Sequence, residues 1–196
     1  MTTARTAARR RRLITLLGAV ALGAGIGYAL TGFDPLERAI LEVTLPLRHE
    51  DIIRQQAHEK DVPADLIAAV IYTESRFRDQ TSEAGARGLM QITPETANVI
   101  EDLSGGETFV LDDLADPDIN IRYGTFYLDH LLELYAGNEV AALAAYNAGP
   151  TRVNGWGGAK LEVADIPDEG VRGYVEEVLA KRDEYQDKYS RELGFE

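Results

Sequence analysis

The sequence predicts a mainly α-helical domain preceded by an apolar N-terminal segment. Apolar residues recur at helical spacing in several segments, residues that favour helix starts precede these segments, and glycine-containing loops separate them. No stretch shows the alternation of apolar and polar residues that is typical of a half-buried strand. We therefore expect a helical domain with little or no β-structure over residues 47–190.

The expected helices follow one another with short breaks between them. Pro63 opens one helix near its first position, and Asp116 followed by Pro117 provides an N-cap and a first helical residue for another. Asn138 is expected to cap the helix after that one. The helices are expected over residues 49–60, 63–76, from about 94, 117–135, 138–147 and 171–189, with loops at 78–90, at 102–115 and around glycines 155, 157 and 158.

The N-terminus resembles a membrane anchor. Residues 1–12 hold five arginines and no acid, and residues 13–32 contain an uncharged apolar run of 18 residues, Leu13 to Leu30. This length is just enough to span a bilayer as a helix, and the preceding arginines place the N-terminus in the cytoplasm and residues 33–196 outside. The alternative is a signal peptide cleaved near Gly27-Tyr28-Ala29, which would give a secreted protein.

Two short segments flank the predicted domain. Residues 33–46 are interpreted as a linker or a short interfacial segment because Pro35 and Pro46 punctuate them, and residues 191–196 as a C-terminal tail. Neither segment contributes a candidate functional residue.

Charge and composition exclude several classes of function. Residues 33–196 hold 15 Lys and Arg against 33 Asp and Glu, a net charge of −18, so we expect no nucleic-acid binding. There are no cysteines, so disulfides and thiolate metal sites are excluded, and His49, His58 and His130 lack metal-ligand spacing. We therefore expect no metal and no cofactor, and the sequence identifies no protein partner or oligomeric state.

Glu74 stands on the apolar face of the second expected helix. It follows Ile67 by seven residues and Val70 by four, so helical spacing places its carboxyl group on their face. Burial without a cationic partner raises the pKa of a carboxyl group, and a protonated carboxyl group can donate a proton to a leaving oxygen. The alternative is a frayed last turn in which Glu74 points to water, and this helix alone leaves both possibilities open.

Four short motifs follow in order along the domain. Glu74-Ser75 ends the second helix, Gly88-Leu89-Met90-Gln91 follows a loop, Ala145-Tyr146-Asn147-Ala148-Gly149 ends a later helix, and Tyr174-Val175 lies in the last one. Together they resemble the catalytic domain of the soluble lytic transglycosylases, which are similar to lysozyme. The resemblance covers nearly the whole domain and favours a catalytic role for Glu74.

The resemblance implies a bilobed, lysozyme-like helical domain with a cleft for peptidoglycan glycan strands. It also implies cleavage of the β-1,4 bond between N-acetylmuramic acid and N-acetylglucosamine without water, for cell-wall remodelling or turnover. The muramic acid 6-hydroxyl attacks, a 1,6-anhydro end forms, and Glu74 serves as acid and then base. Residues expected to bind or orient the substrate are Ser75, Ser82, Met90, Gln91, Tyr146, Asn147 and Tyr174.

Two of these residues have more specific expected roles. By the same resemblance, Tyr146 would orient Glu74 through a hydrogen bond, and Ser82 would contact the substrate near the cleavage point. Tyr174 would flank the site.

Two other functions remain open. Goose-type lysozymes share part of the pattern but carry aspartates where this chain has Ser82 and Thr93, so a carboxylate that would activate water is missing there. A hydrolytic muramidase would then need Asp79 or Glu83 as the substitute. A non-catalytic glycan-binding protein of the envelope is the third possibility, although binding alone does not require a carboxyl group on an apolar face.

Overall fold

The computed structural model describes residues 35–105 and 111–195, and these divide between two compact units, Met1–Pro46 and Leu47–Glu196. Every regular element described is a helix, and the described residues form no strand beyond two isolated bridges, Thr81 with Arg87 and Arg87 with Ile92. The prediction of a mainly helical domain with little or no β-structure is therefore confirmed.

The first unit contributes one described helix, α2 (Pro35–Thr44). The segment interpreted as a linker or a short interfacial segment therefore contains a helix that was not predicted. Pro35 occupies the first position of the helix, where its missing N–H group costs no hydrogen bond. Pro46 follows the helix end, so both prolines bracket a helix instead of marking irregular chain.

The predicted transmembrane run Leu13 to Leu30 lies outside the described residues. Among the helices that are described, none has the length and apolar character needed to cross a bilayer.

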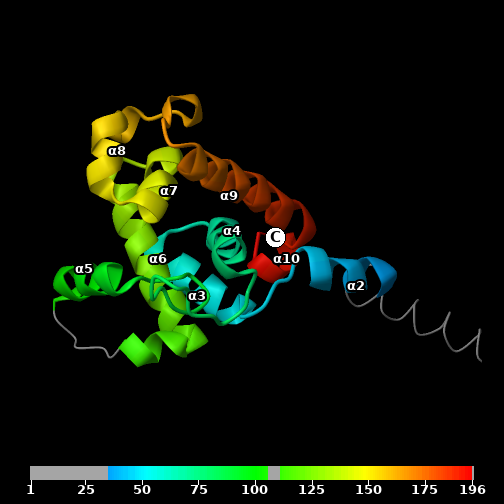
Figure 1. Ribbon diagram of the computed structural model, residues 1–196. Helices are drawn as coiled ribbons and strands as arrows, with labels where there is room; N and C mark the ends of the chain where they lie inside the picture. The colour runs from blue at the N-terminus through cyan, green and yellow to red at the C-terminus, as the bar shows by residue number, and fades with distance from the viewer. Residues whose placement is uncertain (1–34, 106–110, 196) are drawn as a thin grey trace, which may run out of the picture. The chain divides into compact units, whose positions relative to one another are not determined.

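The second unit is built around α4, as Figure 1 shows. Its residues from Ala64 to Tyr72 are all buried, because α9 packs along one side and α3 along another. Helix α6 packs against α3 and α7, and α7 also contacts α8 and α9. The bounds are α3 (Glu50–Lys60), α4 (Ala64–Ser75), α5 (Pro94–Ser104), α6 (Pro117–Leu134), α7 (Glu139–Ala148), α8 (Pro150–Trp156), α9 (Glu169–Lys188) and α10 (Ser190–Leu193), with 3-10 turns at Leu111–Ala115, Gly158–Lys160 and Val163–Asp165.

Local cap chemistry explains several of these helix starts. The Asp116 carboxylate accepts from the backbone N–H groups of Asp118 and Ile119, at 2.8 and 3.3 Å. Asn138 caps α7 by accepting from the N–H of Ala141 at 3.1 Å. Both caps were expected from the sequence.

Two segments differ from the prediction. The loop expected around the glycines after Gly149 contains α8, because Pro150 can start a helix although it cannot continue one. The expected C-terminal tail overlaps α10, whose Leu193 is buried and which contacts α3 and α9.

The motif Gly88 to Gln91 is held in place by Asn120 of α6. The fully buried Asn120 amide donates to the carbonyls of Arg87 and Leu114, at 3.0 and 2.9 Å, and its oxygen accepts from the N–H of Met90 at 2.8 Å. A Cβ on Gly88 would lie 2.1 Å from this amide, so the motif requires glycine there.

Candidate active site

Glu74 lies in the last turn of α4, where the chain reverses. Arg76 and Phe77 both adopt positive φ angles of 53° and 58°, and Phe77 turns inward with its ring 6.2 Å from that of Tyr185. Glu74 therefore sits at the negative end of the helix dipole, which disfavours a carboxylate. The frayed, solvent-directed alternative is wrong, because the Glu74 side chain lines a pocket and is largely buried.

Burial raises the pKa of the Glu74 carboxyl group to about 7, and the neighbouring Tyr174 hydroxyl opposes this rise. No lysine or arginine of the described chain contributes to this pKa. The group is therefore protonated in a large fraction of molecules near neutral pH, which a general acid requires.

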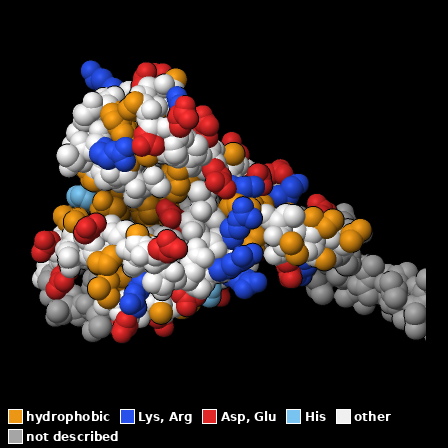
Figure 2. All heavy atoms as spheres, in the orientation of Figure 1, with side chains coloured by type: hydrophobic (Ala, Val, Ile, Leu, Met, Phe, Trp, Pro, Cys, Tyr) orange, Lys and Arg blue, Asp and Glu red, His pale blue; other side chains and the backbone are white. Residues whose placement is uncertain are grey.

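The pocket beside Glu74 has a volume of about 190 Å³. Figure 2 shows this face of the molecule hollowed between α8 and α5, with hydrophobic side chains on the floor of the hollow. Residues from five segments converge on the pocket: Glu74 from α4, Ala86, Gln91 and Ile92 from the following loop, Thr93 and Thr96 at the start of α5, Tyr127 from α6, and Tyr146 and Asn147 from α7.

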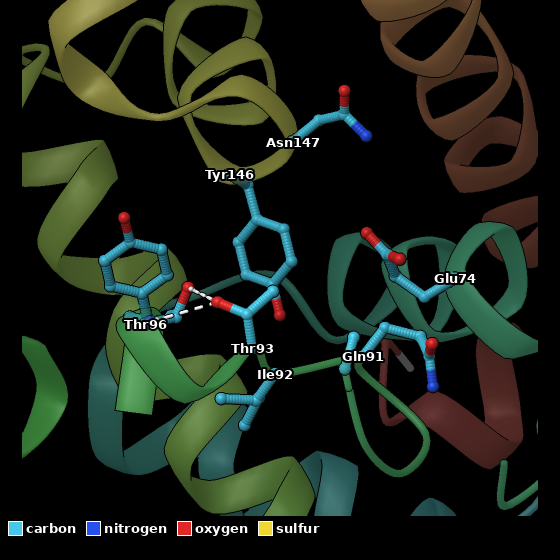
Figure 3. Close-up of a pocket in the computed structure, with 9 residues that line it drawn as sticks. Glu74, Gln91, Ile92, Thr93, Thr96, Tyr146 and Asn147 are labelled. Carbon is cyan, nitrogen blue, oxygen red and sulfur yellow. Dashed lines mark hydrogen bonds between the residues drawn. The ribbon is translucent and has the colours of Figure 1, made fainter. Parts of the chain in front are cut away.

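Glu74, Gln91, Tyr146 and Asn147 are the predicted site residues that the structure brings together. In Figure 3 the Glu74 carboxyl group points into the space below Asn147, and Tyr146 stands beside it. The exposed Asn147 side chain lies at the end of α7 and is free to meet a ligand that enters the pocket.

The predicted hydrogen bond between Tyr146 and Glu74 is wrong. The Tyr146 hydroxyl donates its single proton to the carbonyl of Met90 at 2.9 Å, and its ring lies 5.7 Å from that of Tyr127. Burial and the nearby Glu74 carboxyl group both raise the pKa of Tyr146. Tyr146 therefore holds the Met90 loop against α7 and forms one wall of the pocket.

Tyr174 of α9 is the tyrosine that acts on the Glu74 carboxyl group. Its hydroxyl is fully buried, and burial together with the charge of Glu74 raises its pKa well above the usual value. The Tyr174 hydroxyl can donate a hydrogen bond to the Glu74 carboxylate, and this interaction favours the ionised form of Glu74.

Like Tyr174, three other predicted residues do not line the pocket. The Ser75 hydroxyl is buried and donates to the carbonyl of Ile71 at 3.1 Å, and the Ser82 hydroxyl accepts from the N–H of Ala86 at 3.0 Å. The Met90 side chain is fully buried against Gly124, where an added Cβ would lie 2.4 Å from its sulfur. These residues shape the loop and α4. Met90 is connected to the pocket wall through its backbone carbonyl, which accepts the hydrogen bond from Tyr146.

The comparisons with known proteins agree with this geometry. The family model "Transglycosylase SLT domain" matches residues 51–167, more than half of the chain. The chain belongs to the transglycosylase SLT domain family.

Individual relatives show how far this likeness extends. The soluble lytic murein transglycosylase of Escherichia coli is 36% identical over 149 residues, which cover 71% of this chain and 23% of the relative. The membrane-bound lytic murein transglycosylase F 2 of Alkalilimnicola ehrlichii is 35% identical over 118 residues, covering 56% of this chain and 24% of that protein. The chain thus spans about a quarter of the length of these curated relatives.

Solved structures show the same fold. The lytic transglycosylase Slt of Pseudomonas aeruginosa, solved as an inactive glutamate-to-glutamine mutant, superimposes with a TM-score of 0.70 at 34% identity and covers 76% of this chain and 25% of that one. The 70-kDa soluble lytic transglycosylase of Escherichia coli gives a TM-score of 0.69 at 34% identity, covering 75% and 25%.

Some pocket residues of this SLT domain were not predicted as site residues. Thr93 caps α5 by accepting from the N–H of Thr96 at 3.1 Å, and the two hydroxyls lie 3.0 Å apart in the pocket wall. A threonine before Pro94 is a recognisable helix cap in the sequence. Its place in the pocket wall could not be predicted, because it depends on where α5 starts relative to α4 and α7. Ala86, Ile92 and Tyr127 carry no chemical signal that distinguishes them from core residues.

Glu74 is the only carboxyl group among the pocket-lining residues that the structure describes. Asp79 and Glu83, the acids considered as substitutes for a hydrolytic base, are exposed and lie outside this lining. Within the described ranges, no group of three histidines and acidic residues could hold a metal ion.

Proposed function

We propose that this chain is a peptidoglycan lytic transglycosylase with Glu74 as its catalytic residue. The observation that carries the proposal is a single, largely desolvated carboxyl group with a pKa of about 7 that lines a pocket. Because the matched region covers only about a quarter of each relative, activity and substrate are inferred for this chain from its SLT domain alone.

The reaction needs one carboxyl group in two protonation states. Protonated Glu74 donates to the glycosidic oxygen of the departing N-acetylglucosamine while the bond from C1 of N-acetylmuramic acid to that oxygen breaks. The muramic acid 6-hydroxyl then forms a bond to C1 and gives its proton to the Glu74 carboxylate. The acid is thereby restored, a 1,6-anhydro ring closes, and no water is consumed.

The pocket favours this reaction over hydrolysis. Inverting hydrolysis uses a second carboxylate to activate water, and retaining hydrolysis uses one as a nucleophile. The side chain at the position where goose-type lysozymes carry an aspartate is Thr93, whose hydroxyl is engaged as the cap of α5. Gln91, Asn147 and Thr96 are polar groups suited to binding the sugar hydroxyl and acetamido groups.

We also propose that Leu13 to Leu30 anchors the protein in the membrane with the SLT domain on the extracytoplasmic side. The uncharged run with preceding arginines supports this, and one relative is named as membrane-bound. Alkaline extraction of membranes should leave the full chain in the pellet. Recovery of a soluble chain that begins near Thr31 would show a cleaved signal peptide instead.

Mass spectrometry of products from purified peptidoglycan tests the reaction. The full chain in detergent should release muropeptides with anhydro ends, each lighter by one water than the hydrolytic product. Reducing ends would establish a hydrolytic muramidase. Retained binding to peptidoglycan with no released product would establish a glycan-binding protein.

A further inference from the structure

Helix α2 exposes a row of large apolar side chains. Leu36, Ile40 and Val43 are exposed by 70%, 52% and 83%, and their spacing of four and three residues places them on one face of the helix. Leu41 is buried on another face. We name Leu36, Ile40 and Val43 the α2 stripe, and Figure 2 shows hydrophobic side chains gathered over this helix.

Polar side chains flank the α2 stripe. When the residues are placed at 100° intervals, Glu37 and Thr44 lie along one edge, Ala39 and then Glu42 follow the other edge, and Arg38 lies on the opposite face. Single exposed apolar residues are ordinary on a protein surface, but three on one face of a short helix with polar borders indicate contact with an apolar phase.

The position of α2 in the chain identifies that phase. Only five residues separate Leu30, the end of the predicted membrane span, from Leu36. An extended chain of that length reaches roughly 20 Å at most, so α2 begins close to the surface of any bilayer that the span crosses. A second copy of the chain is a poorer occupant, because three side chains offer far less than the roughly 800 Å² per partner of a stable interface.

We infer that α2 lies along the outer surface of the membrane, with the α2 stripe inserted at the boundary between headgroups and acyl chains. This inference rests on the proposed anchor. The helix carries two acids and one arginine, so the insertion depends on apolar burial and needs no anionic lipid. A membrane-bound α2 would favour glycan strands near the membrane as substrates.

The absence of cysteine makes this testable with single labels on the full chain. Val43→Cys carries a nitroxide on the α2 stripe, and Glu42→Cys carries the same label on the neighbouring exposed residue outside it. The chain is reconstituted in vesicles of phosphatidylcholine alone. Collision rates of each label are measured with oxygen, which partitions into lipid, and with a water-soluble nickel complex.

The logarithm of the oxygen-to-nickel collision ratio should be positive at Val43→Cys and negative at Glu42→Cys. A negative value at both positions on chains that float with the vesicles overturns the inference while leaving the anchor intact. Protection of Val43→Cys from both reagents, with spin–spin broadening, would also overturn it and indicate a second copy. Chains that fail to float would refute both the anchor and the insertion.

Discussion

Helix α4 carries two carboxyl groups whose pKa values are raised by desolvation, one near each end, and they face different surroundings. Asp65 is only 4% exposed in the first turn, and burial raises its pKa, but the N–H of Leu66 at 2.9 Å and the charge of Arg182 both lower it. Glu74 in the last turn has only the Tyr174 hydroxyl to oppose the effect of burial, and its pKa reaches about 7.

Arg182 makes the surroundings of Asp65 a structural network. It projects from α9, forms an ion pair with Glu139 of α7, and contacts Asp183 at 3.0 Å. Its charge therefore links three helices around Asp65. If Glu74 is the acid, as we propose, the comparison teaches that burial alone is not enough: a carboxyl group must also be denied a cation and face a pocket.

Replacing each carboxyl group by its amide gives the largest expected difference. Glu74→Gln should reduce release of anhydro-muropeptides by about 10²–10⁴-fold, because glutamine has no proton to donate. Asp65→Asn, which keeps an oxygen to accept from Leu66, is the matched control and should retain most of the activity. Rates are measured on purified peptidoglycan with both variants at equal folded concentration. Near-wild-type turnover by Glu74→Gln would refute the proposed role of Glu74 as the general acid.

The stability of Glu74→Gln relative to the wild type should change with pH. The pKa of Glu74 is about 7 in the folded state against the ordinary 4.5. The free energy of unfolding should therefore fall by about 3 kcal/mol as pH rises from 4.5 through 7, because the folded protein holds this carboxyl group less favourably when it is ionised. Glu74→Gln removes this loss and should therefore melt at a higher temperature than the wild type at pH 8, with a smaller difference at pH 4.

Arg182→Met should destabilise the fold without removing the catalytic group. The variant leaves Asp65 and Glu139 without their shared cation, and breaking such a partly buried network costs about 1–3 kcal/mol, less than a fully buried pair. The pKa of Asp65 should rise further, so the defect should be greatest at neutral pH and smallest below pH 3.8, where the carboxyl group is protonated in both states. Urea unfolding at the two pH values measures this. A pH-independent loss would show that packing, not charge, is responsible.

Tyr146→Phe should cost about 1 kcal/mol, because the hydrogen bond to the Met90 carbonyl at 2.9 Å is lost. Activity should fall as the loop that carries Gln91 loosens, while the pKa of Glu74 should change little. The thermal melt and the pH–rate profile are compared with those of the wild type. Full activity in this variant would reduce Tyr146 to a packing residue.

Tyr174→Phe should have the smallest effect. The Tyr174 hydroxyl lowers the pKa of Glu74, so its removal should raise that pKa and move the alkaline limb of the kcat profile to higher pH. Stability should change little, since only the hydroxyl group is removed and the aromatic ring is kept. A shift of the alkaline limb to lower pH would contradict the conclusion that the Tyr174 hydroxyl lowers the pKa of Glu74.

Local signals predicted most of the helices and the side of α4 on which Glu74 lies. Caps at Asp116 and Asn138 and the apolar spacing around Glu74 depend on neighbours in the sequence, and the structure confirms them. Helices α2 and α8 were missed because Pro35 and Pro150 were interpreted as breaks, although proline also fits the first helical position.

Partners across the fold could not be predicted in the same way. The Tyr146 hydroxyl donates a hydrogen bond to the carbonyl of Met90, 56 residues away in the sequence. This partner is determined by how α7 packs against the loop after α4. Thr96 and Tyr127 enter the pocket for the same reason, since only the packing of α5 and α6 brings them there. The effect of Tyr174 on Glu74 likewise depends on the contact between α9 and α4.

Titration of the Glu74 carboxyl carbon by nuclear magnetic resonance tests the central claim most directly. The full chain is labelled with ¹³C at the glutamate carboxyl groups, and Glu74→Gln identifies the signal by its disappearance. We predict a midpoint near pH 7, set by burial without a cation. A midpoint near 4.5, the ordinary value for glutamate, would contradict the assignment of Glu74 as an acid protonated near neutral pH.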